Sequence, residues 1–144
     1  MTEKTRHNIR LGSWDDLKDD AAPIRMQVFV VEQRVPLEEE IDVADSLCVH
    51  AVAYAAQGVA IGTGRLLPDG HIGRMSVLIE HRGKGVGGEI LQALMDHARL
   101  IGFSEVALSA QTHALGFYRQ YGFVEEGEEY LDANIPHLMM RRSL

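Results

Sequence analysis

The sequence contains a single cysteine, Cys48, so no disulfide can form within the chain. A lone cysteine is typical of proteins that work in a reducing compartment. A long hydrophobic run is also missing, because the most apolar stretch, 49–61, includes polar residues and is too short to span a bilayer. The first ten residues lack the apolar core of a secretory signal. These absences predict a cytoplasmic protein with no membrane partner.

Basic residues are outnumbered, and the formal net charge is −7. Nucleic-acid binding needs a basic face, so we expect no nucleic-acid partner. The acidic residues are concentrated, because ten of them lie between Asp15 and Asp45 beside only three basic residues. This segment is either a solvated helical face or a field that attracts a cationic substrate. The seven histidines show no metal-ligand spacing, so we predict no metal site.

The length of 144 residues is that of one domain, and it is enough to bury a full hydrophobic core. No internal repeat or linker divides the chain, so we expect a single domain over residues 1–144. The hydrophobic fraction of 46% and the charged fraction of 24% are ordinary for a globular protein.

Hydrophobic periodicity and turn residues predict an α+β fold. Ser13 is expected to cap a first helix, and Pro23 to begin a second helical segment. Gly102 closes the clearest helix, which has an apolar stripe at helical spacing. Strands are expected at 8–11, 48–56, 59–67, 71–79, 105–110, 123–131 and 135–142, and further helices at 86–101 and 113–121. Tight turns imply antiparallel hairpins, whereas the helix at 86–101 implies one parallel pairing in a mixed sheet.

A glycine-rich loop, Arg82-Gly83-Lys84-Gly85-Val86-Gly87-Gly88, precedes that helix. The first turn of a helix leaves backbone N–H groups unpaired, and the helix dipole adds partial positive charge. Glycine lets an anion approach the backbone closely, and two basic side chains lie among these glycines. The loop therefore predicts a binding site for the pyrophosphate of a nucleotide-bearing cofactor.

Three classes of cofactor site compete for this loop. The spacing of a phosphate-binding P-loop does not occur in the chain. Gly83, Gly85 and Gly88 match the dinucleotide fingerprint G-x-G-x-x-G. That fingerprint belongs in a parallel βαβ unit, whereas the preceding strands are expected to be hairpins. A dinucleotide-binding protein therefore stays an alternative, and the third class is an acyl-coenzyme A site.

Two motifs about thirty residues apart resemble those of the GNAT superfamily of N-acetyltransferases. Arg82-x-x-Gly85-x-Gly87 is similar to its acyl-coenzyme A signature. The segment Phe117-Tyr118-Arg119-Gln120-Tyr121-Gly122-Phe123 is similar to its F-Y-x-x-x-G-F helix end. Four further segments, 28–33, 62–66, 73–77 and 135–137, resemble the ElaA/YjcF-like subgroup of small bacterial GNAT proteins. The resemblance runs from about residue 8 to the end of the chain.

The resemblance implies a GNAT fold, with a mixed sheet of six or seven strands and about four helices. It also implies direct transfer of an acetyl group from acetyl-CoA, the cosubstrate, to an amine. In the family, the strand at Val77 holds the pantetheine arm, and the strand beginning at Glu105 diverges to open a cleft. The cofactor-binding residues expected on this basis are Val77, Leu78, Ile79, Arg82, Gly83, Lys84, Gly85, Val86, Gly87, Gln111 and Tyr118.

The reaction requires two proton transfers. Tyr118 matches the family's general acid, which protonates the departing thiolate, whereas Phe117, Tyr121 and Phe123 are expected in the core. A lysine-like amine has a pKa of about 10.4, so deprotonating it at neutral pH costs about 4.6 kcal/mol. His137 and Glu32 are the candidate bases, and we favour His137.

The acceptor is expected to be a primary amine of a small molecule or peptide. The acidic segment 15–45 favours a cationic one, such as a polyamine, an aminosugar or a lysine side chain. Arg25 and Arg34 either pair with an acidic acceptor group or balance the surrounding carboxylates. A CoA-binding sensor or interaction module without turnover is the alternative in another class. The sequence leaves open whether the protein is a monomer or a homodimer.

Overall fold

The computed structural model describes residues 7–144. Residues 1–6, part of the segment expected to contain no secretory signal, lie outside the described residues. The strands are β1 (Asn8–Gly12), β2 (Val49–Tyr54), β3 (Ala60–Leu66), β4 (His71–Val77), β5 (Glu105–Gln111), β6 (Val124–Asp132) and β7 (Ile135–Ser143). The α-helices are α1 (Trp14–Arg25), α2 (Leu37–Glu40), α3 (Val86–Leu100) and α4 (Leu115–Gln120). Shorter helical turns are η1 (Met26–Glu32), η2 (Val43–Leu47), η3 (Ile79–His81) and η4 (Thr112–Ala114).

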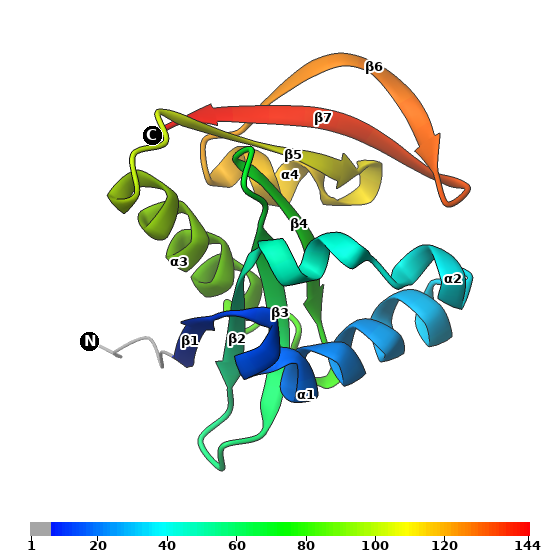
Figure 1. Cartoon of the computed structure of the whole chain (residues 1–144). Helices are drawn as coiled ribbons and strands as arrows, with labels where there is room; N and C mark the ends of the chain where they lie inside the picture. Colours follow the sequence, from blue (N-terminus) through cyan, green and yellow to red (C-terminus); the bar gives the residue numbers. More distant parts are fainter. Residues whose placement is uncertain (1–6) are drawn as a thin grey trace.

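The seven strands form one mixed sheet in the order β1-β2-β3-β4-β5-β7-β6 (Figure 1). Strands β1 to β4 pair antiparallel in chain order, as the predicted hairpins require. The single parallel pairing joins β4 to β5, which are connected through α3. Strand β7 lies between β5 and β6 and is antiparallel to both. The mixed α+β sheet predicted from the sequence is therefore confirmed, with seven strands.

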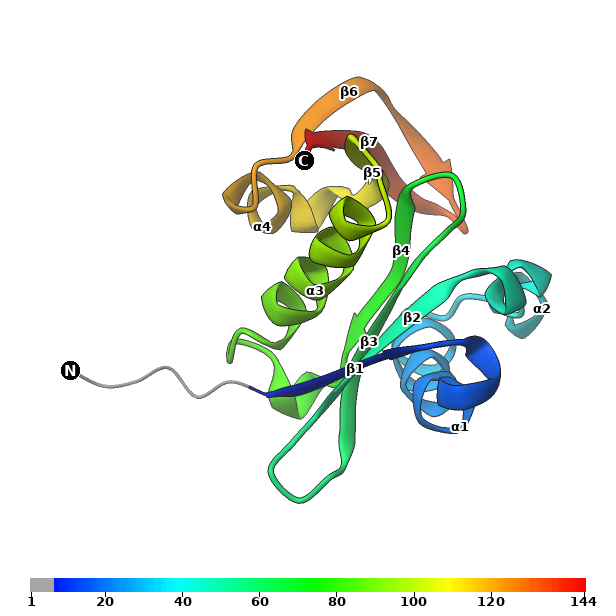
Figure 2. The same ribbon diagram turned by 60° about the vertical axis from the view of Figure 1, so that its left-hand side comes forward.

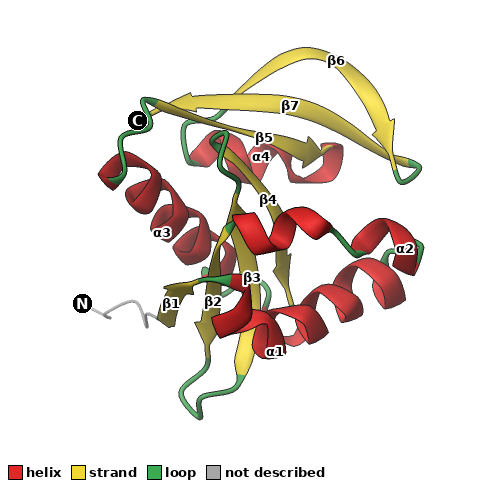
Figure 3. Cartoon of the chain, in the orientation of Figure 1, coloured by secondary structure: helices red, strands yellow, loops and turns green. Residues whose placement is uncertain are grey.

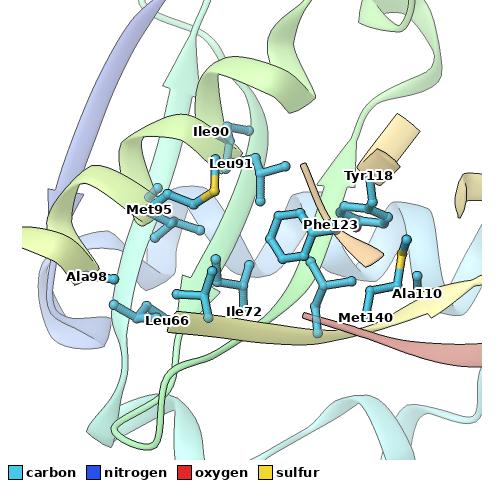
Figure 4. Packing of buried hydrophobic residues seen from close by; sticks show 14 of the residues in the cluster. Leu66, Ile72, Ile90, Leu91, Met95, Ala98, Ala110, Tyr118, Phe123 and Met140 are labelled. Atoms are coloured by element: carbon cyan, nitrogen blue, oxygen red, sulfur yellow. The ribbon is translucent and has the colours of Figure 1, made fainter. Parts of the chain in front are cut away.

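Helices α1 and α3 cover opposite faces of the sheet at β1 to β4 (Figure 2; Figure 3). The larger core cluster lies on the α3 face, where Ile90, Leu91 and Leu94 are fully buried against the sheet. Phe123 and Met140 extend this cluster toward β7 (Figure 4). Truncating one such buried leucine to alanine typically lowers the free energy of unfolding by about 2–5 kcal/mol. This packing therefore holds α3 firmly against the sheet.

Most of the predicted ends of elements are confirmed. The Ser13 hydroxyl caps α1 by accepting a hydrogen bond from the backbone N–H of Asp16. Gly102 follows α3 with a φ of 106°, the left-handed conformation of a helix C-cap. Phe123 is buried as expected, whereas Phe117 and Tyr121 are half-buried and pack against the core. No helix in residues 7–144 is long and apolar enough to cross a bilayer.

The prediction that Pro23 begins a second helix is wrong. Pro23 lies inside α1, which continues without a break into the π-helical turn η1. A proline costs helix stability because it lacks an N–H group. Ile24 and Val28, on either side of the junction, are buried, and this packing accounts for the continuity. The hydrogen bond from the Gln33 N–H to the Val28 carbonyl closes η1.

Candidate active site

The glycine loop begins α3 as a free helix N-terminus. Gly85 has a φ of 81°, a left-handed conformation that glycine adopts without strain, and Val86 is the first helical residue. The backbone N–H groups of residues 85–88 donate no hydrogen bond to any described residue. Four unpaired donors at a helix N-terminus form an anion site, so the loop fits a pyrophosphate group.

The two sequence motifs meet at this loop. A Cβ atom added at Gly88 would lie 1.8 Å from the Tyr121 hydroxyl, and one added at Gly87 would lie 3.5 Å from the Phe117 ring. Only glycine at position 88 therefore lets α4 pack this closely on the first turn of α3. The close packing brings Tyr118, on the same short helix, to the same cavity as the loop.

A cleft opens where β4 and β5 separate. The two strands pair only at His71–Ala107 and Ile72–Leu108, and beyond these residues each has a free edge toward the other. Figure 1 shows β4 and β5 running in different directions from this point. A cavity of about 1050 Å³ lies there, lined by the glycine loop, the second half of β4, the end of β5 and α4. The divergence of the strand beginning at Glu105, implied by the family resemblance, is thus present.

Tyr118 lies in the wall of this cavity. Its side chain is 9% exposed, and its ring packs edge-on against Phe117 and Phe123. Burial raises the pKa of the Tyr118 hydroxyl to about 12. The phenol therefore keeps its proton throughout the neutral range, which is the form that a general acid needs.

Arg82 and Glu32 form an ion pair across the mouth of the cavity. The Arg82 Nη1 and Nη2 atoms donate to the two carboxylate oxygens of Glu32 at 2.7 and 2.8 Å. Its Nε atom donates to the Val77 carbonyl at 2.8 Å. The hydrogen bond from Arg82 holds the pKa of Glu32 below its ordinary value. Glu32 is thus a weak proton acceptor at neutral pH, which disfavours it as the base.

Gln111 contacts the opposite wall of the cleft. Its side-chain amide exchanges hydrogen bonds with that of Gln33, at 2.9 and 3.3 Å, and its oxygen lies 2.6 Å from a ring nitrogen of His113. Gln33 follows η1, so this contact joins the end of β5 to the helical segment formed by α1 and η1. It also stands at the border between the large cavity and a second cavity of about 320 Å³, both of which Gln33 and Gln111 line.

His137 lines both cavities from β7. Its Nδ1 atom lies 2.6 Å from the carbonyl oxygen of Ile135, and a carbonyl can only accept, so Nδ1 carries the proton. Nε2 of the neutral ring is then an unprotonated acceptor. The ring is buried and stacks on Tyr130, which fixes its orientation. His137 thus lies in the lining of both cavities with Nδ1 engaged by the backbone.

A buried ionic network lies beside the cleft and joins the end of α1 to α2, η2 and β3. The Arg25 Nε atom donates to Glu40 at 2.5 Å, and its Nη1 atom donates to Asp45 at 2.8 Å. Arg65 donates to Asp45 at 2.6 Å and to Asp42 at 2.7 Å. Burial raises the pKa of Asp45, but the hydrogen bonds from Arg25 and Arg65 outweigh it and leave this pKa lowered.

The network decides between the two roles expected for Arg25. This side chain balances carboxylates of the protein itself and does not pair with an acceptor group. Arg34, by contrast, is exposed and forms no ion pair with any residue in 7–144. Sequence reasoning did not single out Arg65 or Arg74, which line the large cavity. The only hint of them in the sequence is that each lies in a segment, 62–66 or 73–77, that resembles the GNAT family. Among residues 7–144, no group of three or more His, Cys, Asp or Glu side chains could hold a metal ion.

Comparisons with known proteins agree with this geometry. Residues 15–144 match the family described as "Acetyltransferase (GNAT) domain". The chain is 44% identical over 127 residues to the "Uncharacterized N-acetyltransferase YjcF" of Bacillus subtilis, covering 85% of this chain and 90% of that protein. An acyl-CoA N-acyltransferase structure from Pseudomonas aeruginosa is 32% identical, with a TM-score of 0.84 over 95% of this chain and 99% of that one. The Escherichia coli ElaA structure is 25% identical, with a TM-score of 0.83 and the same coverage.

The chain therefore belongs to the GNAT family of N-acetyltransferases, which are acyl-CoA-dependent enzymes. The match to YjcF and ElaA confirms the ElaA/YjcF-like subgroup. The dinucleotide alternative does not fit, because the only parallel pairing in residues 7–144, β4 with β5 across α3, covers two residue pairs of an otherwise antiparallel sheet, whereas the fingerprint opens an extended parallel sheet.

Proposed function

We propose that the protein transfers the acetyl group of acetyl-CoA directly to a primary amine of a small molecule or peptide. One observation carries the proposal: a single cleft has an anion site at one end and two proton-handling side chains, Tyr118 and His137, in its walls. Acetyl-CoA supplies the activated thioester. The cleft supplies positioning, which can provide about 7–11 kcal/mol of the barrier reduction for a well-oriented pair.

The cofactor-binding part of the proposal uses mainly backbone groups. The loop from Arg82 to Gly87 would bind the pyrophosphate, with Lys84 exposed for charge. The Leu78 N–H donates to the Ile61 carbonyl on β3, and the carbonyls of Val77 and Ile79 accept hydrogen bonds from Arg82. The N–H groups of Val77 and Ile79 would therefore be the ones left for the pantetheine arm. Gln111, at the end of β5, would contact the same ligand. Its side-chain amide would then turn away from Gln33.

The proton transfers are assigned to two residues that line the cleft. His137 Nε2 takes a proton from the ammonium form of the acceptor, and the freed amine attacks the thioester carbonyl. The new N–C bond forms as the C–S bond breaks, and the nitrogen gives up its second proton to solvent, which leaves a neutral amide. The Tyr118 hydroxyl donates its proton to the departing thiolate and regains one from solvent. Glu32 is the weaker candidate for the base because Arg82 lowers its pKa.

The charge of the acceptor follows from which carboxylates are free. Within the acidic segment 15–45, Glu40, Asp42 and Asp45 are engaged by arginine side chains. Glu39 and Asp132 line the smaller cavity beside His137. We propose that they favour an acceptor that arrives as a protonated amine. A cytoplasmic location, where acetyl-CoA and amines are both present, is part of the same proposal.

The test is release of free thiol from acetyl-CoA with a panel of amines, with mass spectrometry of the acetylated product. His137→Asn keeps a donor for the Ile135 carbonyl but removes Nε2, so we expect turnover to fall about 10²–10⁴-fold. Glu32→Gln should change it less than about threefold, because Glu32 takes no proton.

Two outcomes would reject parts of the proposal. Equal losses in both variants, or a larger loss in Glu32→Gln, would reject His137 as the base. Tight CoA binding without acetylation of any amine would favour the sensor alternative, in which the cleft recognises the ligand without turnover.

A further inference from the structure

Arg74 occupies an unusual position in β4. Strand β3 pairs Thr63 with Ser76 and Arg65 with Gly73, so a single residue of β3 faces both Arg74 and Met75. This is a β-bulge, which redirects a side chain out of the regular alternation. Arg74 has a φ of 51°, a left-handed conformation that costs a non-glycine residue free energy. The surrounding structure therefore holds the Arg74 side chain where a regular strand would not place it.

The guanidinium of Arg74 is only partly used by the protein. Its Nη2 atom donates to the carbonyl oxygens of Glu39 and Glu40 at 3.2 and 3.4 Å. Its Nε atom is buried without an acceptor, and its Nη1 atom likewise has none, among residues 7–144. Arg74 lines both the large cavity and the smaller one. Unsatisfied donors at the junction of two cavities mark a place where a ligand would accept hydrogen bonds.

Among residues 7–144, no carboxylate accepts a hydrogen bond from Arg74. Asp42 lies 2.7 Å from Arg65 but 3.7 Å from Arg74, and Glu40 and Asp45 are held by Arg25. Arg65, which is 6% exposed, also leaves its buried Nε atom without an acceptor and lines the large cavity. Burial, and then the nearby charges of Arg65 and Arg25, lower the pKa of Arg74. Three arginines share the three carboxylates Glu40, Asp42 and Asp45, so the charges balance, but the Nε donors of Arg65 and Arg74 are left without acceptors.

We propose, building on the proposed N-acetyl transfer, that Arg74 binds a carboxylate of the acceptor, so the acceptor is an amino acid in the chemical sense. A carboxylate suits this site because it accepts several charge-assisted hydrogen bonds from one guanidinium. His137, which lines the same two cavities, takes a proton from the amine of the same molecule. Glu39 and Asp132 lie beside them in the smaller cavity and complement an ammonium group. The proposed acceptor is therefore a zwitterion, with a carboxylate as well as an ammonium group, and not a purely cationic amine.

The test compares amino acids with the amines that decarboxylation would give: L-lysine with cadaverine, and L-phenylalanine with phenethylamine. The wild type should acetylate the carboxylate-bearing member of a pair with a kcat/KM at least about tenfold higher. Arg74→Gln should abolish this preference, and Arg74→Lys should keep part of it because the charge remains. Arg99→Gln, an exposed change on α3, is the matched control and should leave the preference unchanged.

A binding measurement makes the result independent of turnover. Calorimetry with the acetylated products, N-acetyl-L-phenylalanine and N-acetylphenethylamine, in the presence of CoA should show tighter binding of the acid, lost in Arg74→Gln. The affinity for CoA itself should be unchanged in that variant, which confirms that it is folded. If no amine is acetylated, the proposed function fails, yet Arg74-dependent binding of the acid still supports the carboxylate site.

Two results would overturn the inference while leaving N-acetyl transfer intact. One is a wild-type preference for the decarboxylated amines. The other is an equal loss for both members of a pair in Arg74→Gln, which would make Arg74 a residue that only holds α2 in place. Equal binding of both acetylated products to the wild type would also overturn it.

Discussion

The two ends of the cleft, for which we propose the cofactor and the acceptor as ligands, are built by different means. The cofactor end is built from one continuous segment, 77–88, and its donors are backbone N–H groups beside an exposed ion pair between Arg82 and Glu32. The acceptor end is assembled from separate segments and depends on buried arginine side chains. Backbone groups read the geometry of a pyrophosphate whatever the nearby side chains are. The acceptor end, in contrast, can change its ligand through single substitutions, provided that the buried charges stay balanced.

The largest effect should come from removing a buried charge. Arg25→Met leaves Glu40 without its side-chain partner and weakens the support of Asp45, so we expect a loss of about 3–5 kcal/mol in the free energy of unfolding. Urea denaturation monitored by circular dichroism measures it. Arg99→Met, which removes an exposed charge on α3, should cost less than about 0.5 kcal/mol. Similar values for both variants would mean that the acceptor end does not depend on its ionic network.

Tyr118→Phe should affect chemistry and not binding. The phenylalanine ring keeps the contacts with Phe117 and Phe123, but the proton donor is lost, so kcat should fall about a hundredfold. The dissociation constant for CoA should stay within about twofold, since the backbone donors are untouched. Steady-state kinetics and calorimetry measure the two quantities. Tyr54→Phe, far along β2, is the control, and unchanged turnover in Tyr118→Phe would remove Tyr118 from the mechanism.

Arg82→Gln tests the cofactor end, where the ion pair is exposed. The variant should bind CoA about tenfold more weakly, a loss of about 1.4 kcal/mol, because one charge near the pyrophosphate is gone. Its free energy of unfolding should change by less than about 1 kcal/mol. S-acetylpantetheine, which has no pyrophosphate, should bind both proteins equally. An equal loss for this truncated ligand would place Arg82 on the pantetheine arm instead.

The smallest effect is expected in the pH profile. Because the pKa of Tyr118 is raised to about 12, its acid form persists well above the pH at which an ordinary tyrosine, with a pKa of about 10, is half deprotonated. Between pH 8 and pH 10, ionisation of Tyr118 should therefore not lower kcat. The profile of the wild type should match that of Tyr118→Phe in shape over this range. A decline centred below pH 10 that disappears in Tyr118→Phe would show an ordinary pKa.

Local patterns explain why the cofactor end could be predicted from the sequence. The loop, the apolar stripe of α3 and the helix that contains Tyr118 are each encoded by neighbouring residues. Positions such as Gly85 and Gly102 have the left-handed φ that their turns require. The acceptor end could not be predicted in this way. Gln33 meets Gln111 across 78 positions of sequence, and Arg74 turns inward only because β4 has a bulge opposite β3.

The error at Pro23 has the same origin. Proline is a local signal for a helix start, and here the signal lost to tertiary packing, because Ile24 and Val28 are both buried. The acidic segment was also misleading in its simplest form. Its charge is compatible with a solvated helical face or with a field for a cationic substrate, whereas Glu40 and Asp45 are buried partners of Arg25. Charge counted along a sequence does not show which of the charges are neutralised inside the fold.

The short pairing between β4 and β5 has a consequence for the edges of the sheet. An ordinary open sheet has two edges, both at its rim, but this one has two more in its interior, where β4 and β5 part. Interior edges are shielded from other proteins by the walls of the cleft, so they escape the tendency of exposed strands to recruit neighbouring chains. The pantetheine arm that we propose as ligand would then lie along these interior edges. On this proposal, the space between the diverging strands β4 and β5 is where the extended arm of the cofactor would bind.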